Sequence, residues 1–381
     1  MRYTLENKVL TIYPEGKITS DNVKGISEEL ITLYKENDFA KICIDCENLD
    51  YVSSAGLRML LRVIKGRHKS EIINVNPTIH EILETTGFTE LVNVESALRT
   101  VDIEGAEVIG GGFFSTVYRL DKDTIIKVYT NGTSLENIRR EKNIAKKAFI
   151  YGVPCAITYD VVKAGDYYGV IFEALNAGTL LEYLIDNPDK LNEVIERYVA
   201  FLREVNSAKA PSGIFPRAKA FALEKLEIIR EYVTSDEYEK IRSVFLDLED
   251  ADNIVHSDCH LGNIMLQNDD LLLIDMDTAV TGDPVFEIAS LFCTYKVFEM
   301  HNPGNCKEFL GIDHDTCFAL YDRTFDLYFA ELTDEQKAAK KKLCEFIGWI
   351  HMLFWIKRFA SDDKEFFNYC YGNLKAALER F

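Results

Sequence analysis

Basic residues are scarce in this sequence. Its 381 residues include 43 Lys and Arg but 62 Asp and Glu, which gives a formal net charge of −19. Nucleic-acid binding requires a basic surface, so we expect no nucleic-acid partner. An acidic surface is compatible with a cationic substrate, although it more often serves solubility.

The sequence also lacks a long apolar run, a leader and regularly paired cysteines. Its longest apolar run, residues 346–356, is too short to cross a bilayer and contains His351. The first residues, MRYTLENKVL, do not show the charged-then-apolar pattern of a signal peptide. Of nine cysteines only Cys43 and Cys46 are closely spaced, and in a strand they would point to opposite faces. We therefore expect no membrane association, reduced thiols and a cytoplasmic location.

Residues 1–103 are predicted to form a small α/β domain, because apolar patterns typical of strands and helices alternate along them. Ser20 and Ser54 are the expected N-caps of the first two helices, and residues 95–101 are expected to form a helical tail. The predicted strands cover 9–13, 40–46 and 72–75, and the predicted helices cover 20–36, 53–68 and 77–85.

Two segments of this region, NLDYVSSAGLRMLL (48–61) and TIHEILETTGF (78–88), resemble the STAS domain, the fold of anti-sigma-factor antagonists. In signalling members of that family, a Ser or Thr directly before the motif's Gly is phosphorylated. Here Ala55 precedes Gly56, and Ser53 replaces the usual Asp. The resemblance therefore implies a docking or regulatory module for a protein partner, without the usual phosphorylated residue. Ser54 could be modified, but a capping role is favoured.

A glycine-rich segment, GGGFFSTVY, opens the remaining chain with the spacing GxGxxSxV. Gly110 and Gly112 would let backbone amides approach phosphates closely. Ser115 stands at the third defined position of that spacing, and Val117 would cover a nucleotide base. On its own such a segment is as often a simple hairpin turn.

Lys127 lies inside an apolar strand pattern, TIIKVY, where an unpaired ammonium group would be costly. Glu141, on a helix expected to begin near Ser134, is the predicted partner, with Glu136 as its nearest competitor. Together they would hold the α- and β-phosphates of a nucleotide. A further strand over 167–173 leads to a hinge, where the backbone around Glu173 and Leu175 would contact adenine.

The stretch HSDCHLGNIM…LLLIDMD places Asp258, Asn263 and Asp275 after short apolar strands. Phosphoryl transfer requires a carboxylate to accept the hydroxyl proton, and oxygen ligands to hold Mg²⁺ against the phosphates. Alone, this motif could equally consist of ordinary turn residues. Its position after the glycine-rich segment and Lys127, in that order, favours a phosphoryl-transfer site.

These segments resemble the aminoglycoside phosphotransferase and choline kinase-like family over about residues 105–375. The resemblance implies a bilobal protein-kinase-like domain over 104–381, with an N-lobe to about residue 175 and a helix-rich C-lobe, and hence an α+β chain overall. It also implies that Asp258 is the base, that Asn263 and Asp275 bind Mg²⁺, and that Asp283 braces the catalytic loop. His260 could lie near the acceptor hydroxyl or brace the loop.

The sequence departs from the family pattern at four positions. Ser257 and Ser115 replace glycines, Leu261 replaces a proline, and Glu287 stands where Asp is common. None of these changes removes a charge or a metal ligand, so we expect an active enzyme.

The predicted function is Mg²⁺-dependent transfer of the γ-phosphoryl group of ATP, or GTP, to a hydroxyl of a small molecule. A kinase acting on a protein and a non-catalytic nucleotide sensor are the alternatives. No activation segment follows Asp275, which argues against a protein substrate, and the complete set of site residues argues against a sensor. Four aromatic residues near the C-terminus, and His351, are expected to pack in the core rather than bind a ligand: Trp349, Phe354, Trp355 and Phe359.

Overall fold

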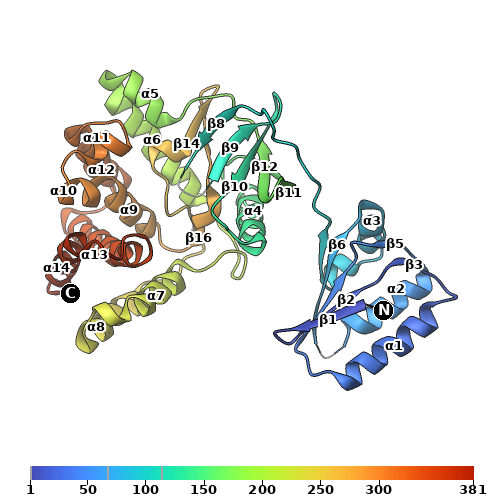
Figure 1. Cartoon of the computed structure of the whole chain (residues 1–381). Coiled ribbons are helices and arrows are strands. Elements are labelled where there is room, and N and C mark those ends of the chain that lie inside the picture. Colours follow the sequence, from blue (N-terminus) through green and yellow to red (C-terminus); the bar gives the residue numbers. More distant parts are fainter. Residues whose placement is uncertain (1, 67, 113–114) are drawn as a thin grey trace. The chain divides into compact units, whose positions relative to one another are not determined.

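The computed structural model describes residues 2–66, 68–112 and 115–381. The chain separates into two compact units, one ending at Val101 and the other beginning at Asp102 (Figure 1). Each unit has its own apolar core, and each is described by itself below.

The first unit is an α/β domain around a five-stranded sheet of order β1-β2-β4-β6-β7. β1 pairs antiparallel with β2, and the remaining neighbours pair in parallel. A separate parallel pair joins β3 to β5. The strands are β1 (Arg2–Glu6), β2 (Val9–Tyr13), β3 (Gly16–Ile18), β4 (Lys41–Asp45), β5 (Leu49–Val52), β6 (Lys69–Val75) and β7 (Asn93–Ser96), and the helices are α1 (Val23–Glu36), α2 (Ser54–Ile64) and α3 (Pro77–Thr85).

Two predicted N-caps of this unit were wrong by one or two positions. α1 begins at Val23 after Asn22, whose side chain instead accepts a hydrogen bond from the Thr19 N–H. Ser53 caps α2 through a bond from the Gly56 N–H, so Ser54 is an exposed first residue of the helix.

The predicted helical tail over 95–101 was also wrong. Residues Asn93–Ser96 form the edge strand β7, which pairs in parallel with β6. The outer backbone groups of β6 need hydrogen-bond partners, and β7 supplies them while Val94 packs against the core. The local apolar pattern does not reveal that the edge of β6 needs a neighbouring strand.

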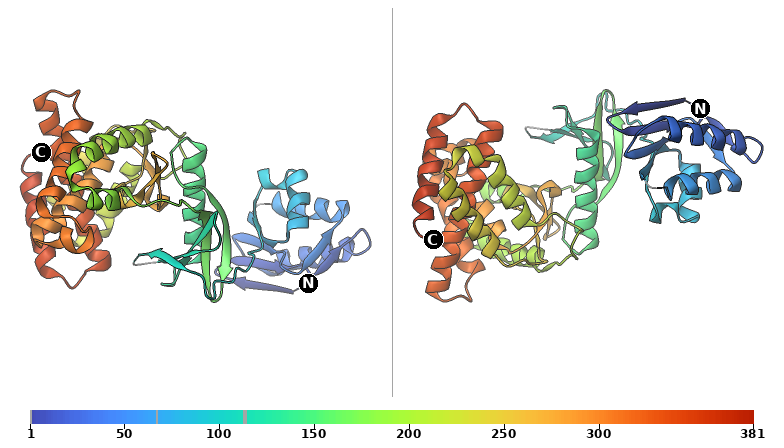
Figure 2. Two further views of the ribbon diagram at one scale, coloured as in Figure 1. Left: turned by 90° about the horizontal axis from the view of Figure 1, so that it is seen from above. Right: turned by 90° about the horizontal axis from the view of Figure 1, so that it is seen from below.

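The second unit begins with an antiparallel sheet of order β11-β12-β10-β9-β8 and the helix α4. α4 begins at Leu135, close to the predicted start near Ser134, and Ser134 caps it by accepting a bond from the Asn137 N–H. The turned views show α4 running along this sheet (Figure 2). The elements are β8 (Val108–Gly111), β9 (Ser115–Arg119), β10 (Thr124–Tyr129), α4 (Leu135–Ile150), β11 (Thr158–Ala164) and β12 (Tyr167–Glu173).

The remainder of this unit is mainly helical and also contains two short antiparallel strand pairs, β13 with β16 and β14 with β15. Its elements are α5 (Leu180–Asp186), α6 (Leu191–Ser207), α7 (Ala218–Ile228), α8 (Ser235–Asp247), β13 (Ile254–Val255), β14 (Ile264–Gln267), β15 (Asp270–Leu273), β16 (Val280–Thr281), α9 (Val285–Phe292), α10 (Phe298–His301), α11 (Asn305–Phe309), α12 (His314–Tyr328), α13 (Asp334–Phe359) and α14 (Lys364–Leu378).

The aromatic residues of α13 mostly pack as predicted. Trp349 is buried, and Phe354 and Trp355 pack against the same core. Phe359 is the exception, because it is the last residue of the helix and is 43% exposed.

One pair of cysteines contradicts the expectation of reduced thiols. Cys306 and Cys317 form a disulfide, with their Cα atoms 6.6 Å apart. The other seven cysteines are free and buried.

Among the described residues, no helix has both the length and the apolar character needed to cross a membrane.

Candidate active site

Asp258 and Asn263 are brought together by the turn that follows β13. The Asn263 side-chain N–H₂ group donates to the Asp258 carbonyl oxygen at 2.9 Å and to its carboxylate Oδ2 at 3.2 Å. β13 itself is fully buried, so the start of this turn is anchored in the core. The two predicted residues therefore face each other at the surface of the C-lobe core.

Lys127 joins the two lobes through an ion triad. Its Nζ lies 2.9 Å from Glu141 Oε1 on α4 and 2.6 Å from Asp275 Oδ1 at the end of the β14–β15 hairpin. Burial lowers the Lys127 pKa, but the two carboxylates outweigh burial and raise the pKa above its usual value. The predicted Lys127–Glu141 pair is thus formed, and Asp275 is a third member.

His256 connects the turn that carries Asp258 and Asn263, called the catalytic turn below, to the strand that leads to Asp275. Its Nδ1 accepts from the Asp258 N–H at 3.2 Å, so Nε2 carries the proton and donates to the Ile274 carbonyl at 3.1 Å. The ring is completely buried, and burial lowers its pKa. A neutral histidine with this tautomer fixes the position of Asp258 relative to the chain segment that leads to Asp275.

The residue that braces the catalytic turn is Glu287, and the prediction for Asp283 was wrong. Both oxygens of the buried Glu287 carboxylate are used, accepting from the N–H of His256 at 2.7 Å and of Ser257 at 3.0 Å. Asp283 instead accepts from the Val285 N–H at 2.8 Å and from Lys340 at 3.0 Å. It therefore fixes the start of α9 and ties it to α13, and does not reach the catalytic turn.

Tyr295 is a second brace that the sequence did not reveal. It lies in a π-helical turn, Cys293–Val297, and its hydroxyl accepts from the Leu261 N–H at 2.9 Å. Such turns shift side chains relative to a regular helix and often occur at functional sites. No periodicity in the sequence marks this turn.

The Asp258 carboxylate has properties suited to a proton acceptor. Burial, followed by the negative charge of Asp275, raises its pKa to about 7, while the Asn263 hydrogen bond opposes this shift. A base is most effective when its pKa lies near the working pH. The side chain remains 45% exposed, so a substrate can reach it.

His260 lies beside Asp258 and braces the turn. Its Nδ1 accepts from the Gly262 N–H at 3.1 Å, and its Nε2 lies 4.0 Å from Asp258 Oδ1. Burial lowers the His260 pKa to about 4, so the ring is neutral at pH 7. Of the two roles predicted for His260, bracing the loop and lying near the acceptor hydroxyl, the structure shows the first. The His260 Nε2 atom also faces the Asp258 carboxylate.

The predicted phosphate-binding segment forms a β-hairpin next to Lys127. Gly110 pairs with Val117, and Val117 pairs with Lys127 on the neighbouring strand. The Gly112 N–H donates to the Ser115 carbonyl at 2.9 Å, and Ser115 is buried. The loop residues at 113 and 114 lie outside the described residues.

The hinge has less free backbone than predicted. The Glu173 N–H donates to the Ile157 carbonyl, and the Ala174 N–H donates to the Asp123 carbonyl. The Glu173 carboxylate accepts from the Ile157 N–H at 2.6 Å. Within the described residues, the Leu175 N–H has no such partner, so it is a hinge amide that remains able to donate a hydrogen bond.

The fold implies Mg²⁺, and the residues present fit this ion. The Asn263 side-chain oxygen and Asp275 Oδ2 accept no hydrogen bond from the described residues, and carboxylate and amide oxygens suit a hard cation. No group of three or more His, Cys, Asp or Glu side chains among the described residues could hold a metal alone. Phosphate oxygens would have to complete the coordination, as is usual for Mg²⁺ with nucleotides.

Comparison with known proteins identifies both units. The model of the Phosphotransferase enzyme family matches residues 105–323, which is more than half of the chain, and the model of the STAS domain matches residues 2–101. The chain belongs to the phosphotransferase enzyme family. It is a phosphotransferase, and it carries an N-terminal STAS domain.

Individual relatives of this phosphotransferase are distant. BtrV of Bordetella bronchiseptica, named as an anti-sigma factor antagonist, is 28% identical over 87 residues, which cover 22% of this chain and 74% of BtrV. The ADP-bound aminoglycoside phosphotransferase APH(2'')-Ib is 17% identical with a TM-score of 0.46, covering 78% of this chain and 96% of its own. A complex of APH(2'')-IIa with streptomycin and ATP is 16% identical with a TM-score of 0.44, covering 78% and 95%.

Proposed function

We propose that this phosphotransferase moves the γ-phosphoryl group of ATP to a hydroxyl of a small molecule, with Asp258 as the catalytic base. The observation that carries the proposal is the convergence of Lys127, Glu141 and Asp275 next to the Asp258–Asn263 turn. Phosphoryl transfer depends mainly on positioning and charge neutralisation, and this arrangement supplies both.

Each side chain then has one role. Lys127, fixed by Glu141, neutralises the α- and β-phosphates beneath the hairpin of Gly110, Gly112, Ser115 and Val117. Leu175 offers its N–H to the base, while Glu173 secures the hinge. Mg²⁺, held by Asn263 and Asp275, would neutralise charge on the β- and γ-phosphates.

Asp258 orients the acceptor hydroxyl and takes its proton. The acceptor oxygen forms a bond to the γ-phosphorus as the bond from that phosphorus to the β,γ-bridging oxygen breaks, and ADP leaves. A carboxylate with a pKa of about 7 is half ionised at neutral pH and can accept this proton. GTP in place of ATP requires only a different base contact at the hinge.

The STAS domain is proposed to act as a docking or regulatory module for a protein partner. Ala55 has no hydroxyl, and Ser54 is exposed at the first turn of α2. We place the enzyme in the cytoplasm as part of the same proposal, because seven of its nine cysteines are free thiols.

Thermal unfolding with nucleotides tests the site directly. Wild-type protein is expected to be stabilised by ATP only when Mg²⁺ is present. Asp275→Ala is expected to lose this stabilisation by ATP with Mg²⁺. Lys122→Ala, an exposed side chain of the same lobe, serves as the matched control and should respond like wild type. If no nucleotide stabilises the wild-type protein, the proposal fails.

A further inference from the structure

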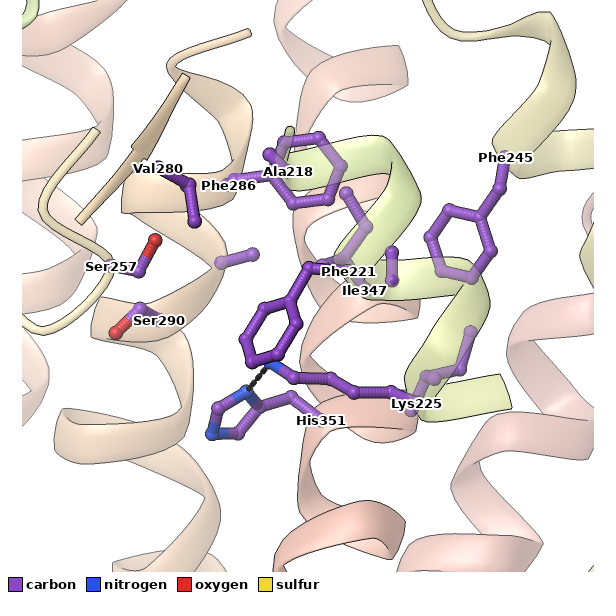
Figure 3. Close-up of a pocket in the computed structure, with 13 residues that line it drawn as sticks. Ala218, Phe221, Lys225, Phe245, Ser257, Val280, Phe286, Ser290, Ile347 and His351 are labelled. Carbon is purple, nitrogen blue, oxygen red and sulfur yellow. Dashed lines mark hydrogen bonds between the residues drawn. The ribbon is translucent and has the colours of Figure 1, made fainter. Parts of the chain in front are cut away.

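A small pocket lies directly beside the catalytic turn. It has a volume of about 40 Å³ and is walled by apolar side chains of α7, α9 and α13. Its polar lining consists of Lys225, Ser257, Ser290 and His351 (Figure 3). Ser257 is the residue immediately before Asp258, so the pocket is bounded in part by the turn that carries the proposed base.

Lys225 has no acidic partner. Its ammonium group donates to His351 Nδ1 at 2.8 Å and lies over the rings of Phe221 and Phe354 at 4.6 and 5.5 Å from their centroids. No carboxylate among the described residues lies within ion-pair distance of it, and burial lowers its pKa to about 8. A buried cation is costly unless a counter-charge compensates it.

The remaining polar groups of the pocket are free to donate hydrogen bonds. Because His351 Nδ1 accepts from Lys225, the ring proton is on Nε2. Neither the Ser257 nor the Ser290 hydroxyl donates a hydrogen bond to any described residue. Lys225, His351 and the two serines together form a set of donors with no acid to serve as their acceptor.

Ser257 is also held at a cost that a glycine would avoid. Its φ is +66°, in the left-handed region that side chains other than glycine rarely adopt. Strain of this kind is common at functional sites. A serine at this position keeps a hydroxyl in the pocket, next to Asp258.

We propose that this pocket binds a carboxylate group of the acceptor through Lys225, so that the enzyme phosphorylates a hydroxy acid. The proposal deepens the function proposed above and rests on it. The pocket volume of about 40 Å³ exceeds the roughly 10–15 Å³ that a single water needs, so the pocket has room for a small polar group. The net charge of −19 favours a cationic acceptor over the whole surface, but the unpaired Lys225 ammonium group would repel a cation that entered this pocket.

Chemical labelling of the wild-type protein tests the pocket without relying on catalysis. Trace acetylation near pH 8, read by mass spectrometry at Lys225, is carried out with glycolate, glycolamide, ethanolamine or inorganic phosphate at constant ionic strength. Glycolate is expected to protect Lys225, and glycolamide and ethanolamine are not. Equal labelling with all four probes, or protection by phosphate alone, would overturn the carboxylate site.

A transfer assay tests the acceptor class. Hydroxy acids, their amides and amino alcohols are compared with Mg²⁺ and ATP, and the acids are expected to have the highest kcat/KM. Lys225→Met should lower kcat/KM for the acids roughly ten- to a hundred-fold, the value of a charge-assisted hydrogen bond, and should leave the amides unaffected. Lys219→Met, on the same helix but already next to Asp250, should keep the preference of wild type.

The two proposals fail in different ways. Efficient transfer to amides or amino alcohols with no preference for acids contradicts the hydroxy-acid proposal and leaves the kinase function standing. Failure of Mg²⁺ and ATP to stabilise the protein contradicts the kinase function, while labelling of Lys225 still reports on the pocket.

Discussion

The Glu287 carboxylate accepts a 2.7 Å hydrogen bond from the backbone N–H of His256, thirty-one residues earlier in the chain. The same carboxylate accepts from Ser257 with its other oxygen. A single buried side chain of α9 therefore fixes the backbone that presents Asp258. The catalytic turn is held by α9 as well as by its own strand.

Removal of this carboxylate should destabilise the fold. Glu287→Ala leaves one buried and one part-buried N–H group without acceptors, at about 1–3 kcal/mol each, so we expect the free energy of unfolding to fall by about 2–6 kcal/mol. Urea unfolding followed by circular dichroism measures this change. Glu345→Ala, which removes only a surface pair with Arg380, should cost less than about 1 kcal/mol. Equal losses in the two variants would contradict the bracing role.

Glycine at position 257 should relieve backbone strain. Ser257→Gly removes the cost of the left-handed conformation, about 1 kcal/mol or more, so the free energy of unfolding should rise by about that amount. Ser257→Ala keeps the strain and removes only the hydroxyl, so it should not be more stable than wild type. Thermal unfolding of the two variants side by side checks this, and a more stable alanine variant would show that backbone conformation is not the cause.

Activity should depend on the ionisation of Asp258. Its pKa is raised to about 7, and the base must be ionised to accept a proton, so kcat/KM for MgATP should rise with pH through about 7 and then level off. The same shift has a stability consequence of opposite sign. The folded state binds this proton more tightly than the unfolded state, so the stabilisation is complete below the unfolded pKa near 4 and is lost as pH rises through about 7. Asp258→Asn should be inactive at every pH and should lack this component of the stability profile, and a pH-independent kcat/KM in wild type would contradict the assignment.

The sequence predicted the parts of the site that local patterns encode. Lys127 interrupts an apolar strand and so implies a buried partner, and Glu141 lies on the one following helix that can supply it. Glu287 could not be assigned this way, because its partners are backbone N–H groups far away in sequence and carry no side-chain signature. The bracing role was instead assigned from the family resemblance to Asp283, which lies only four residues earlier.

Long-range pairings of other kinds were missed on similar grounds. The disulfide between Cys306 and Cys317 depends on how α11 packs against α12. The strand β7 depends on a sheet edge that requires partners. In each case the local pattern is compatible with two structures, and only the tertiary packing selects one.

Breaking the triad at Lys127 should impair nucleotide binding more than folding. In Lys127→Met the methylene stem is largely retained, but Glu141 and Asp275 lose the cation that separates their negative charges. Their repulsion, with no positive charge for the phosphates, should abolish thermal stabilisation by MgATP and lower kcat/KM by at least roughly a hundred-fold, which corresponds to about 2.7 kcal/mol. Glu141→Gln is the informative companion, since it retains Lys127 and Asp275 but loosens the orientation of the ammonium group. It should bind MgATP more weakly than wild type and more tightly than Lys127→Met. Calorimetric titration with MgATP measures all three proteins, and wild-type affinity in Lys127→Met would show that the triad only joins the lobes and does not contact the nucleotide.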